Sequence, residues 1–447
     1  MGGGRFVELV KVVLLGALAP LVVAYLVACF RNPLRYALPP YAVLIPFGST
    51  FSLAPGAFGG VSSLLGLLLG AALVFQLVTT RRGSSSIPLA VPVWLLFLAL
   101  CGFSLFWSIA PLNGFLDWRI LASQVLLMVA LVLTRFDERS LRLFATSLMA
   151  GGIAVVGYGL VQMTLLGGLP GRRTGPGDGA PRFGDDLLGA NNEAAALLLP
   201  LAIAAYRTLS ESGRSRWIHG GVTLLLLYGI LLTGSRGGLL SAVIVFAVVL
   251  WLSGARRAFK IATAVTTAVL LAVVVVFQPA GLASRQVSNA TDSSGRTDIW
   301  EVGAKACPLY CFVGAGWGAF PTVYQQRLAS TPEARVQPRG ATFEPHNIFL
   351  LAAIELGLPG LLMLLLGLAV SLSSALSLPA RFRGPPMAAL VATMVSSFFL
   401  SNMKFKFFWA VLAYVAISET VAAASRARSE PLLLPAGRLV PAESDAP

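Results

Sequence analysis

Charged side chains are scarce in this chain. Asp, Glu, Lys and Arg make up 12% of its 447 residues, whereas 56% are hydrophobic and the mean hydropathy is +0.80. This balance excludes a soluble globular protein of that length. Apolar runs of about 17 to 25 residues alternate with short polar links, which indicates helical membrane spans, since barrel strands alternate over about ten residues. The sequence therefore predicts an all-α polytopic membrane protein.

The apolar runs predict about twelve spans. Thirteen runs are present, at residues 10–30, 37–53, 61–79, 88–107, 117–134, 143–166, 189–206, 217–233, 237–254, 258–277, 346–372, 386–401 and 405–424. One weak segment, either 37–53 with its prolines or the pair around Lys404, is expected not to cross fully. The first run is long and ends in Arg31, so no cleavable signal peptide is evident.

Positive charge is spread over the polar links rather than gathered on one segment, although the net charge is +14. A nucleic-acid partner is therefore not expected. Every second link is basic, and the positive-inside rule places these links and the C-terminus on the cytoplasmic side of the membrane. Strict alternation would put Met1 outside, which Arg5 and Lys11 do not favour, so the side of the N-terminus stays open.

Several links on the opposite, outer side keep positive charge against this bias. They carry Arg172, Arg173, Arg182, Arg236, Arg285, Arg296, Lys305, Arg327, Arg335, Arg339, Lys404 and Lys406. Such charge predicts an anionic partner on that side, and phosphate is the obvious candidate.

The longest link divides the chain. We expect the first part of a transmembrane bundle at 1–277, a cap of amphipathic helices on the outer side at 278–345, C-terminal spans at 346–424 and a disordered cytoplasmic tail at 425–447. In the cap, Ser293 to Glu301 is typical of a helix start, which places Arg296 where free amides also favour an anion. The turn from Gly314 to Gly318 is interpreted as a flexible bend that carries Trp317 as an interfacial aromatic or as a sugar-stacking residue.

Two apolar runs meet with almost no loop between them at Thr233 to Gly238. The glycines of this stretch permit a sharp turn and the close approach of a ligand. Arg236 then lies near the outer membrane boundary, and its guanidinium offers a rigid fork for phosphate oxygens.

Histidine is rare: only His219 and His346 are present. His346 stands where the long polar link meets an apolar run, so it is the candidate general base. The positive end of the following helix favours its neutral form, and Glu344 or Asn347 could orient its ring. Secondary candidates for sugar or phosphate contact, with packing or capping as the alternative, are Asn191, Asn192, Glu193, Trp317, Asn347 and Lys404.

Other polar residues inside the runs call for partners. Asp117 and Arg119 are expected to pair with each other, and the intramembrane Glu355 is expected to have a polar partner. Of four cysteines, Cys307 and Cys311 are interpreted as thiols, because a disulfide at this spacing on one helix is strained. No acidic cluster on the outer face indicates a metal site, and no cofactor is expected.

Four stretches, taken in order, carry a resemblance. Thr233 to Gly238, Gly295 to Trp300, Gly314 to Gly318, and Pro345 to Asn347 with Glu355-Leu356-Gly357 resemble the landmarks of the O-antigen ligase and polymerase superfamily. The resemblance covers roughly residues 185–420, and the ligases within the superfamily are the most similar. It implies a GT-C-type membrane glycosyltransferase of lipopolysaccharide biosynthesis. Such an enzyme transfers O-antigen from undecaprenyl pyrophosphate to lipid A-core in the periplasm.

The chemistry of that reaction suits these residues. Arg236 and Arg296 can hold the pyrophosphate leaving group, and His346 can remove the acceptor's proton without a metal. Single displacement with inversion at the anomeric carbon is the resulting hypothesis. Three alternatives stay open: an O-antigen polymerase, a protein O-oligosaccharyltransferase and a transporter of lipid-linked glycan. The polymerase is favoured by the basic link that carries Arg172, Arg173 and Arg182.

Overall fold

The computed structural model describes a helical bundle. It covers residues 19–48, 50–53, 58–80, 83–84, 86–165, 183–184, 187–261, 264–265, 268, 296–331 and 344–429. In these ranges helices are the regular elements, and the only strand-like features are two isolated bridges. The predicted all-α fold class is confirmed.

Seven helices are long and apolar enough to cross a membrane, among the residues described. They are α4 (Val61–Thr80), α6 (Pro111–Leu133), α7 (Glu138–Leu165), α8 with α9 (Ala190–Ala196 and Leu198–Ser210), α10 (Gly213–Leu232), α16 (Ile348–Ser377) and α18 (Lys406–Ser429). Shorter apolar helices are Ala19–Arg31, α5 (Ala90–Phe103), which continues into the 3-10 turn η1 (Ser104–Phe106), and α11 (Arg236–Leu252). The chain is therefore a multi-pass membrane protein.

Some predicted runs differ from the helices observed. Run 37–53 is not one span: α2 (Pro33–Tyr36) is followed by α3 (Leu38–Leu44), whose seven residues reach only about 10 Å. Pro46 limits it, because the residue before a proline disfavours helix. Run 386–401 belongs to α17 (Ala380–Ser396), which a 3-10 turn, η2 (Asn402–Lys404), separates from α18. Most of run 258–277 lies outside the described residues.

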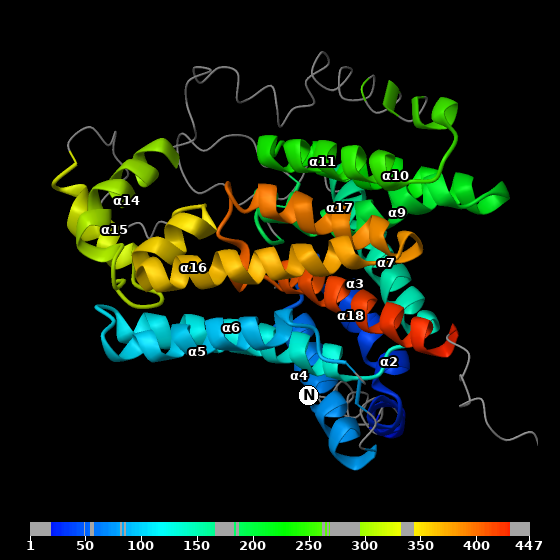
Figure 1. Cartoon of the computed structure of the whole chain (residues 1–447), viewed down its shortest axis with the longest axis horizontal. Helices are drawn as coiled ribbons and strands as arrows, with labels where there is room; N and C mark the ends of the chain where they lie inside the picture. The colour runs from blue at the N-terminus through cyan, green and yellow to red at the C-terminus, as the bar shows by residue number, and fades with distance from the viewer. Residues whose placement is uncertain are drawn as a thin grey trace, which may run out of the picture.

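α16 lies at the centre of the arrangement in Figure 1. α5 packs on α16 and on α6, whereas α17 lies between α16 and the pair α9 and α11. α18 contacts α6, α16 and α17. Two further helices, α14 (Arg296–Tyr310) and α15 (Phe320–Leu328), sit at one end of α16 (Figure 1). We call them, with the turn between them, the cap helices.

A kink in α16 attaches the cap helices. Gly357 has φ 66° and ψ −162° inside the helix, and Pro359 follows it. Because Pro359 has no N–H, the carbonyl of Glu355 loses its helical partner. It accepts instead from Gly316 N at 2.8 Å, and the carbonyl of Ile354 accepts from Ala315 N at 2.8 Å. The kink thus exchanges helical hydrogen bonds for bonds to the turn at Gly314 to Gly318.

That turn is tightly packed, so its interpretation as a flexible bend is wrong. Gly314, Gly316 and Gly318 all have positive φ, between 77° and 96°. A Cβ on Gly316 would lie 2.3 Å from Ser108 Cα, and one on Gly318 would lie 2.6 Å from Gly114 Cα at the start of α6. Only glycine combines this backbone with this closeness.

Trp317 is fully buried, so its assignment as an interfacial residue or a sugar contact is also wrong. Its ring meets Phe97 edge-to-face with centroids 6.3 Å apart, and its backbone N–H donates to Ser104 Oγ at 3.0 Å. The positive-φ glycines on both sides turn the indole inward, toward α5. Trp317 therefore anchors the cap helices to the bundle.

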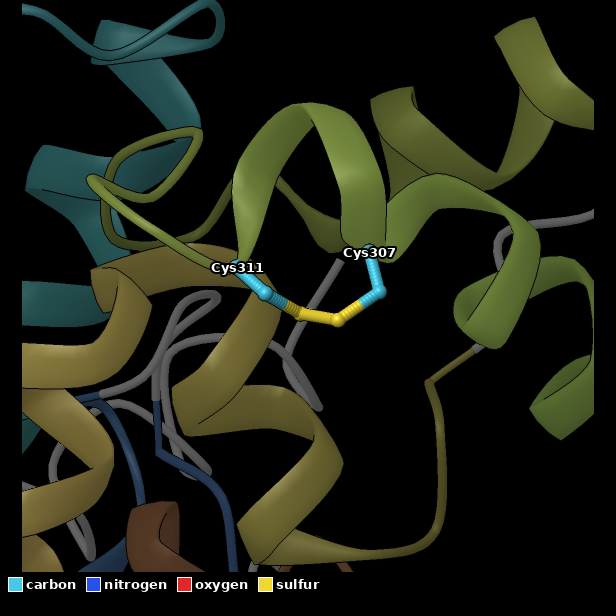
Figure 2. The surroundings of a disulfide bond; sticks show 2 residues. All are labelled: Cys307 and Cys311. Atoms are coloured by element: carbon cyan, nitrogen blue, oxygen red, sulfur yellow. A yellow bond between two sulfur atoms is a disulfide. The ribbon is translucent and has the colours of Figure 1, made fainter.

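Cys307 and Cys311 form a disulfide, which corrects the prediction of two thiols (Figure 2). α14 ends at Tyr310, with Pro308 in its last turn, so Cys311 lies just beyond the helix. The Cα atoms approach to 4.7 Å, within the range that a disulfide bridges. The prediction failed because it assumed an unbroken helix through both residues.

The packed turn generates a stability prediction. Gly316→Ala should lower the thermal midpoint of the detergent-purified protein, because positive φ costs about 1–2 kcal/mol for alanine and the Cβ overlaps Ser108. Gly157→Ala in α7 is the matched control, since nothing lies within 4 Å of its Cβ position. Equal midpoints for the two variants, followed by intrinsic fluorescence on heating, would contradict the packing described.

Candidate functional site

Arg236 is the first residue of α11. Gly234, with φ 59°, reverses the chain directly after α10, and Ser235 caps α11 by accepting from Gly238 N at 3.1 Å. A Cβ on Gly238 would lie 2.4 Å from Ala194 Cβ, so this glycine serves close packing of α11 on α8. The Arg236 side chain is exposed. The predicted tight turn is therefore present, with an arginine at a helix N-terminus.

Arg296 is the first residue of α14 and faces the start of α11. It lines a small pocket together with Ser235 and Gly237, the two neighbours of Arg236. Asn191, Ala195, Gly238, Ser396, Phe399 and Leu400 complete that lining. Arg296 and the free amides at the start of α11 thus meet here, and each favours an anion, while the exposed Arg236 follows the lining residue Ser235. We call this the arginine pocket.

The arginine pocket is narrow in this conformation. Its volume is about 10 Å³, room for roughly one water molecule. Asn191 lines the arginine pocket, as expected of a residue that contacts sugar or phosphate. Asn192 instead donates to Leu188 O at 3.2 Å and serves packing. Glu193 is fully buried, which makes its assignment as a sugar or phosphate contact wrong. A pyrophosphate would therefore bind at the mouth of the pocket or widen it.

His346 is held between two fixed neighbours. Pro345 accepts a hydrogen bond through its carbonyl from Trp300 Nε1 of α14, at 2.8 Å. Asn347 caps α16, its Oδ1 accepting from Phe349 N at 2.9 Å and from Leu350 N at 3.0 Å. His346 itself has φ 48°, an uncommon value for a residue with a side chain. The backbone therefore sets the direction of the imidazole.

The environment of His346 favours its neutral form. Burial lowers the pKa of this imidazole below its usual 6.5, the nearby Arg296 guanidinium lowers it further, and Glu344 opposes them. In the described part of the chain, no hydrogen bond to the ring is formed, and the side-chain oxygen of Asn347 is used for capping. Of the two residues expected to orient the ring, Asn347 is therefore excluded, and Glu344 directs its Oε1 to Lys404 Nζ, 3.2 Å away. The Arg296 guanidinium lies close enough to the His346 imidazole to act on its pKa, so the arginine pocket adjoins His346.

Lys404 joins three segments beside this histidine. Its Nζ lies 2.6 Å from Asp117 Oδ2 of α6 and 3.2 Å from Glu344 Oε1. Burial alone would lower the pKa of Lys404, but Glu344, Asp117 and Glu355 outweigh it and raise that pKa. The carboxylates of Asp117 and Glu344 thus already balance the positive charge of Lys404, which the sequence suggested as a phosphate contact.

The predicted pairing of Asp117 with Arg119 is wrong, because Asp117 turns to Lys404. Arg119 instead lies over the rings of Phe58 and Phe115, 6.0 and 5.3 Å from their centroids. The prediction paired two charges that are close in the sequence. The partner of Asp117 is instead Lys404, 287 residues further along the chain.

Glu355 has the polar partner expected of it. Its Oε1 accepts from Phe320 N, the first residue of α15, at 3.0 Å. A carboxylate at a helix N-terminus satisfies a free amide and suits the helix dipole. Glu355 is therefore a positioning residue that joins the cap helices to α16.

The pocket and histidine together define a class. The chain is a multi-pass membrane protein in which a cationic pocket at two helix starts adjoins a neutral histidine. Among the residues described, no group of three or more His, Cys, Asp or Glu side chains is arranged to hold a metal ion.

Comparison with known families identifies the class further. Residues 221–365 match the family model described as O-Antigen ligase, a stretch that includes Arg236, Arg296 and His346. This match confirms the resemblance to the O-antigen ligase and polymerase superfamily, and it implies a membrane glycosyltransferase type of activity on a lipid-linked glycan. A search of curated proteins found no match. Asn191 and Lys404 lie outside the matched stretch.

The role of Lys404 is testable by stability. Lys404→Met leaves Asp117 and Glu344 without their cation, so the free energy of unfolding should fall by roughly 1–3 kcal/mol, between the values for exposed and for buried pairs. The measurement is chemical unfolding in detergent, with Lys260→Met as control. A Lys404→Met variant as stable as that control would show that the three segments do not depend on the ion pair.

Proposed function

We propose that the protein is an O-antigen ligase of the GT-C type. It transfers O-antigen polysaccharide from undecaprenyl pyrophosphate to lipid A-core, at the periplasmic face of the bacterial inner membrane. The observation that carries the proposal is the position of Arg296. This one cation lines the arginine pocket and also acts on the pKa of His346, so a leaving pyrophosphate and a base would lie side by side.

Each group has a part in the transfer. Arg236 and Arg296 neutralise the charge that develops on the leaving pyrophosphate. His346, neutral and without a hydrogen-bond partner in the described residues, accepts the proton of the acceptor hydroxyl as its oxygen bonds to the anomeric carbon. The glycosyl–phosphate bond breaks on the opposite face, which gives inversion in one displacement. A product that retained the donor's anomeric configuration would contradict this step.

The orientation follows from the length of α18. Its span begins at Lys406, next to the His346 end of the bundle, and continues to Ala427. A helix of that length is long enough to cross the hydrocarbon core, so its end at Ala427 would lie on the opposite side of the membrane from the site. We propose that this is the cytoplasmic side and that the cap helices belong to a periplasmic cap at 278–345. Arg172, Arg173 and Arg182, and the tail after Ser429, lie outside the described residues.

The reaction itself is tested with purified protein in detergent. Undecaprenyl-pyrophosphate-linked O-antigen and lipid A-core are supplied with EDTA and without ATP. We expect ligated product from the wild type and at least a hundredfold less from His346→Ala, as for loss of a general base. His219→Ala, which removes the other histidine, should retain activity.

Other products of the same assay would overturn the proposal. Lengthened lipid-linked glycan without ligation would identify a polymerase, and transfer to a protein acceptor would identify an oligosaccharyltransferase. Movement of intact donor across a vesicle membrane, with no transfer, would identify a transporter. Full activity of His346→Ala would remove the histidine from the mechanism.

The proposed contact of Arg236 with pyrophosphate predicts a loss of activity that substitution by lysine does not restore. Arg236→Ala should reduce kcat/KM for the donor by about 100-fold, in the range for loss of one charge-stabilising group. Arg236→Lys should recover little, because an ammonium lacks the fork that binds two phosphate oxygens. Arg214→Ala, which removes another exposed arginine, is the control. Equal rates for all three variants would show that Arg236 does not contact the donor.

The pKa of His346 predicts the pH profile. The neutral imidazole is the active form, so activity is lost as the pH falls through this pKa. Because the pKa is lowered, the acid limb of kcat/KM should lie below about pH 6.5. Glu344→Gln removes the carboxylate that raises this pKa, so its limb should lie at still lower pH. A limb above pH 6.5, or an upward shift in the variant, would contradict the assignment.

A further inference from the structure

A second, much larger cavity lies beside Lys404 and Lys406. Its volume is about 740 Å³, within the range of ligand-binding cavities. α4 and α6 form its walls, with residues of α3 and the pair Leu187 and Leu188 closing it. Its lining is mostly apolar, and we call it the α4–α6 groove.

Small residues on one face of α4 create this groove. Gly66, Gly70 and Val74 follow one another at four-residue spacing, so they lie on the same helix face. A Cβ on Gly70 would meet only Leu127 Cδ1 of α6, at 3.8 Å. The space between the helices is therefore open at Gly70, and a larger side chain there would fill it.

A cation with no acidic partner lies at one end of the groove. The Nζ of Lys406 donates to Ser62 Oγ at 2.6 Å and to Ser63 Oγ at 3.0 Å. Within the described ranges no carboxylate pairs with it, in contrast to Lys404 two residues earlier. A half-buried ammonium at the edge of a membrane span is costly unless an anion joins it. Ser62 Oγ already donates to Gly48 O at 2.9 Å, so the ammonium of Lys406 is the group suited to a phosphate.

One short segment connects the groove to the arginine pocket. Ser396, Phe399 and Leu400 line the pocket, whereas Lys404, Phe405 and Lys406 line the groove. Between these two stretches the chain contacts the segment that carries His346: Ile348 N donates to Ser397 O at 3.1 Å, and Glu344 binds Lys404. The groove and the arginine pocket therefore lie at the two ends of one segment that packs beside the chain at His346.

We propose that the α4–α6 groove binds the lipid anchor of the glycan acceptor, with acyl chains between α4 and α6 and a phosphate on Lys406. This inference rests on the proposed function, which requires two lipid substrates to meet at His346. The donor's pyrophosphate belongs to the arginine pocket at the far end of the segment. The remaining lipid carries phosphate directly on an acylated glucosamine disaccharide, which matches a cation at the end of an apolar groove.

Binding without turnover tests this inference. Native mass spectrometry of the purified protein would count bound bisphosphorylated hexa-acyl glucosamine disaccharide, undecaprenyl pyrophosphate and dioleoyl phosphatidylglycerol, each added separately. Gly70→Leu fills the groove, and Lys406→Gln removes its cation. Each should weaken binding of the glucosamine lipid at least tenfold and leave undecaprenyl pyrophosphate binding within twofold of wild type.

Matched controls separate the groove from general damage. Gly157→Leu places the same side chain on α7 in open space, and Lys260→Gln removes another half-buried lysine; both should bind like wild type. Should Gly70→Leu fail to fold, shown by a lost thermal transition, Lys406→Gln decides alone.

Three binding results would overturn the inference. Loss of undecaprenyl pyrophosphate binding in the variants would assign the groove to the donor. Equally tight, equally sensitive binding of phosphatidylglycerol would identify a site for bulk lipid, and unchanged binding of all three lipids would leave the groove without this occupant. Because no transfer is measured, a protein that binds the glucosamine lipid here but ligates no glycan refutes the proposed function alone. Glycan transfer with unchanged acceptor KM in both variants refutes this inference alone.

Discussion

The contact of the Lys404 ammonium with Asp117 and Glu344 is the constraint on which the site depends. It joins α6, the segment before α16 and the link between α17 and α18 at one point. None of the three charges would be stable so near the membrane alone, so the segments hold one another in place. Glu344, fixed in this way, lies two residues before His346 and acts on its charge. The ion pair is therefore structural, although it stands beside the chemistry.

The kink of α16 supplies the second anchor. Pro359 leaves a carbonyl without a helical partner, and the glycine turn provides the missing N–H. That bond, the carboxylate of Glu355 on α15 and the buried ring of Trp317 fasten the cap helices to the bundle. α14 then carries Arg296 to the start of α11, while Trp300 of the same helix holds the carbonyl before His346. One helix thus positions the cation and supports the chain at His346.

Local patterns in the sequence predicted what local physics decides. Apolar runs predicted most helices, and Arg236 and Arg296 do begin helices as expected, since caps and glycines act over a few residues. Pairings across the fold could not be predicted this way: Asp117 took Lys404 rather than Arg119, and Trp317 turned inward because distant helices close over it. Cys311 lies just beyond α14, because that helix ends at Tyr310. The α4–α6 groove has no sequence signal, because its glycines resemble ordinary small residues of a span.

The central claim is that a pyrophosphate and the imidazole of His346 share Arg296. With only two histidines in the chain, nuclear magnetic resonance of ¹⁵N-histidine protein can follow the pKa of His346 directly. On addition of undecaprenyl pyrophosphate, the bound anion should offset the guanidinium and favour the imidazolium, so the pKa of His346 rises. A pKa of His346 that does not change on saturation with this lipid would contradict the account.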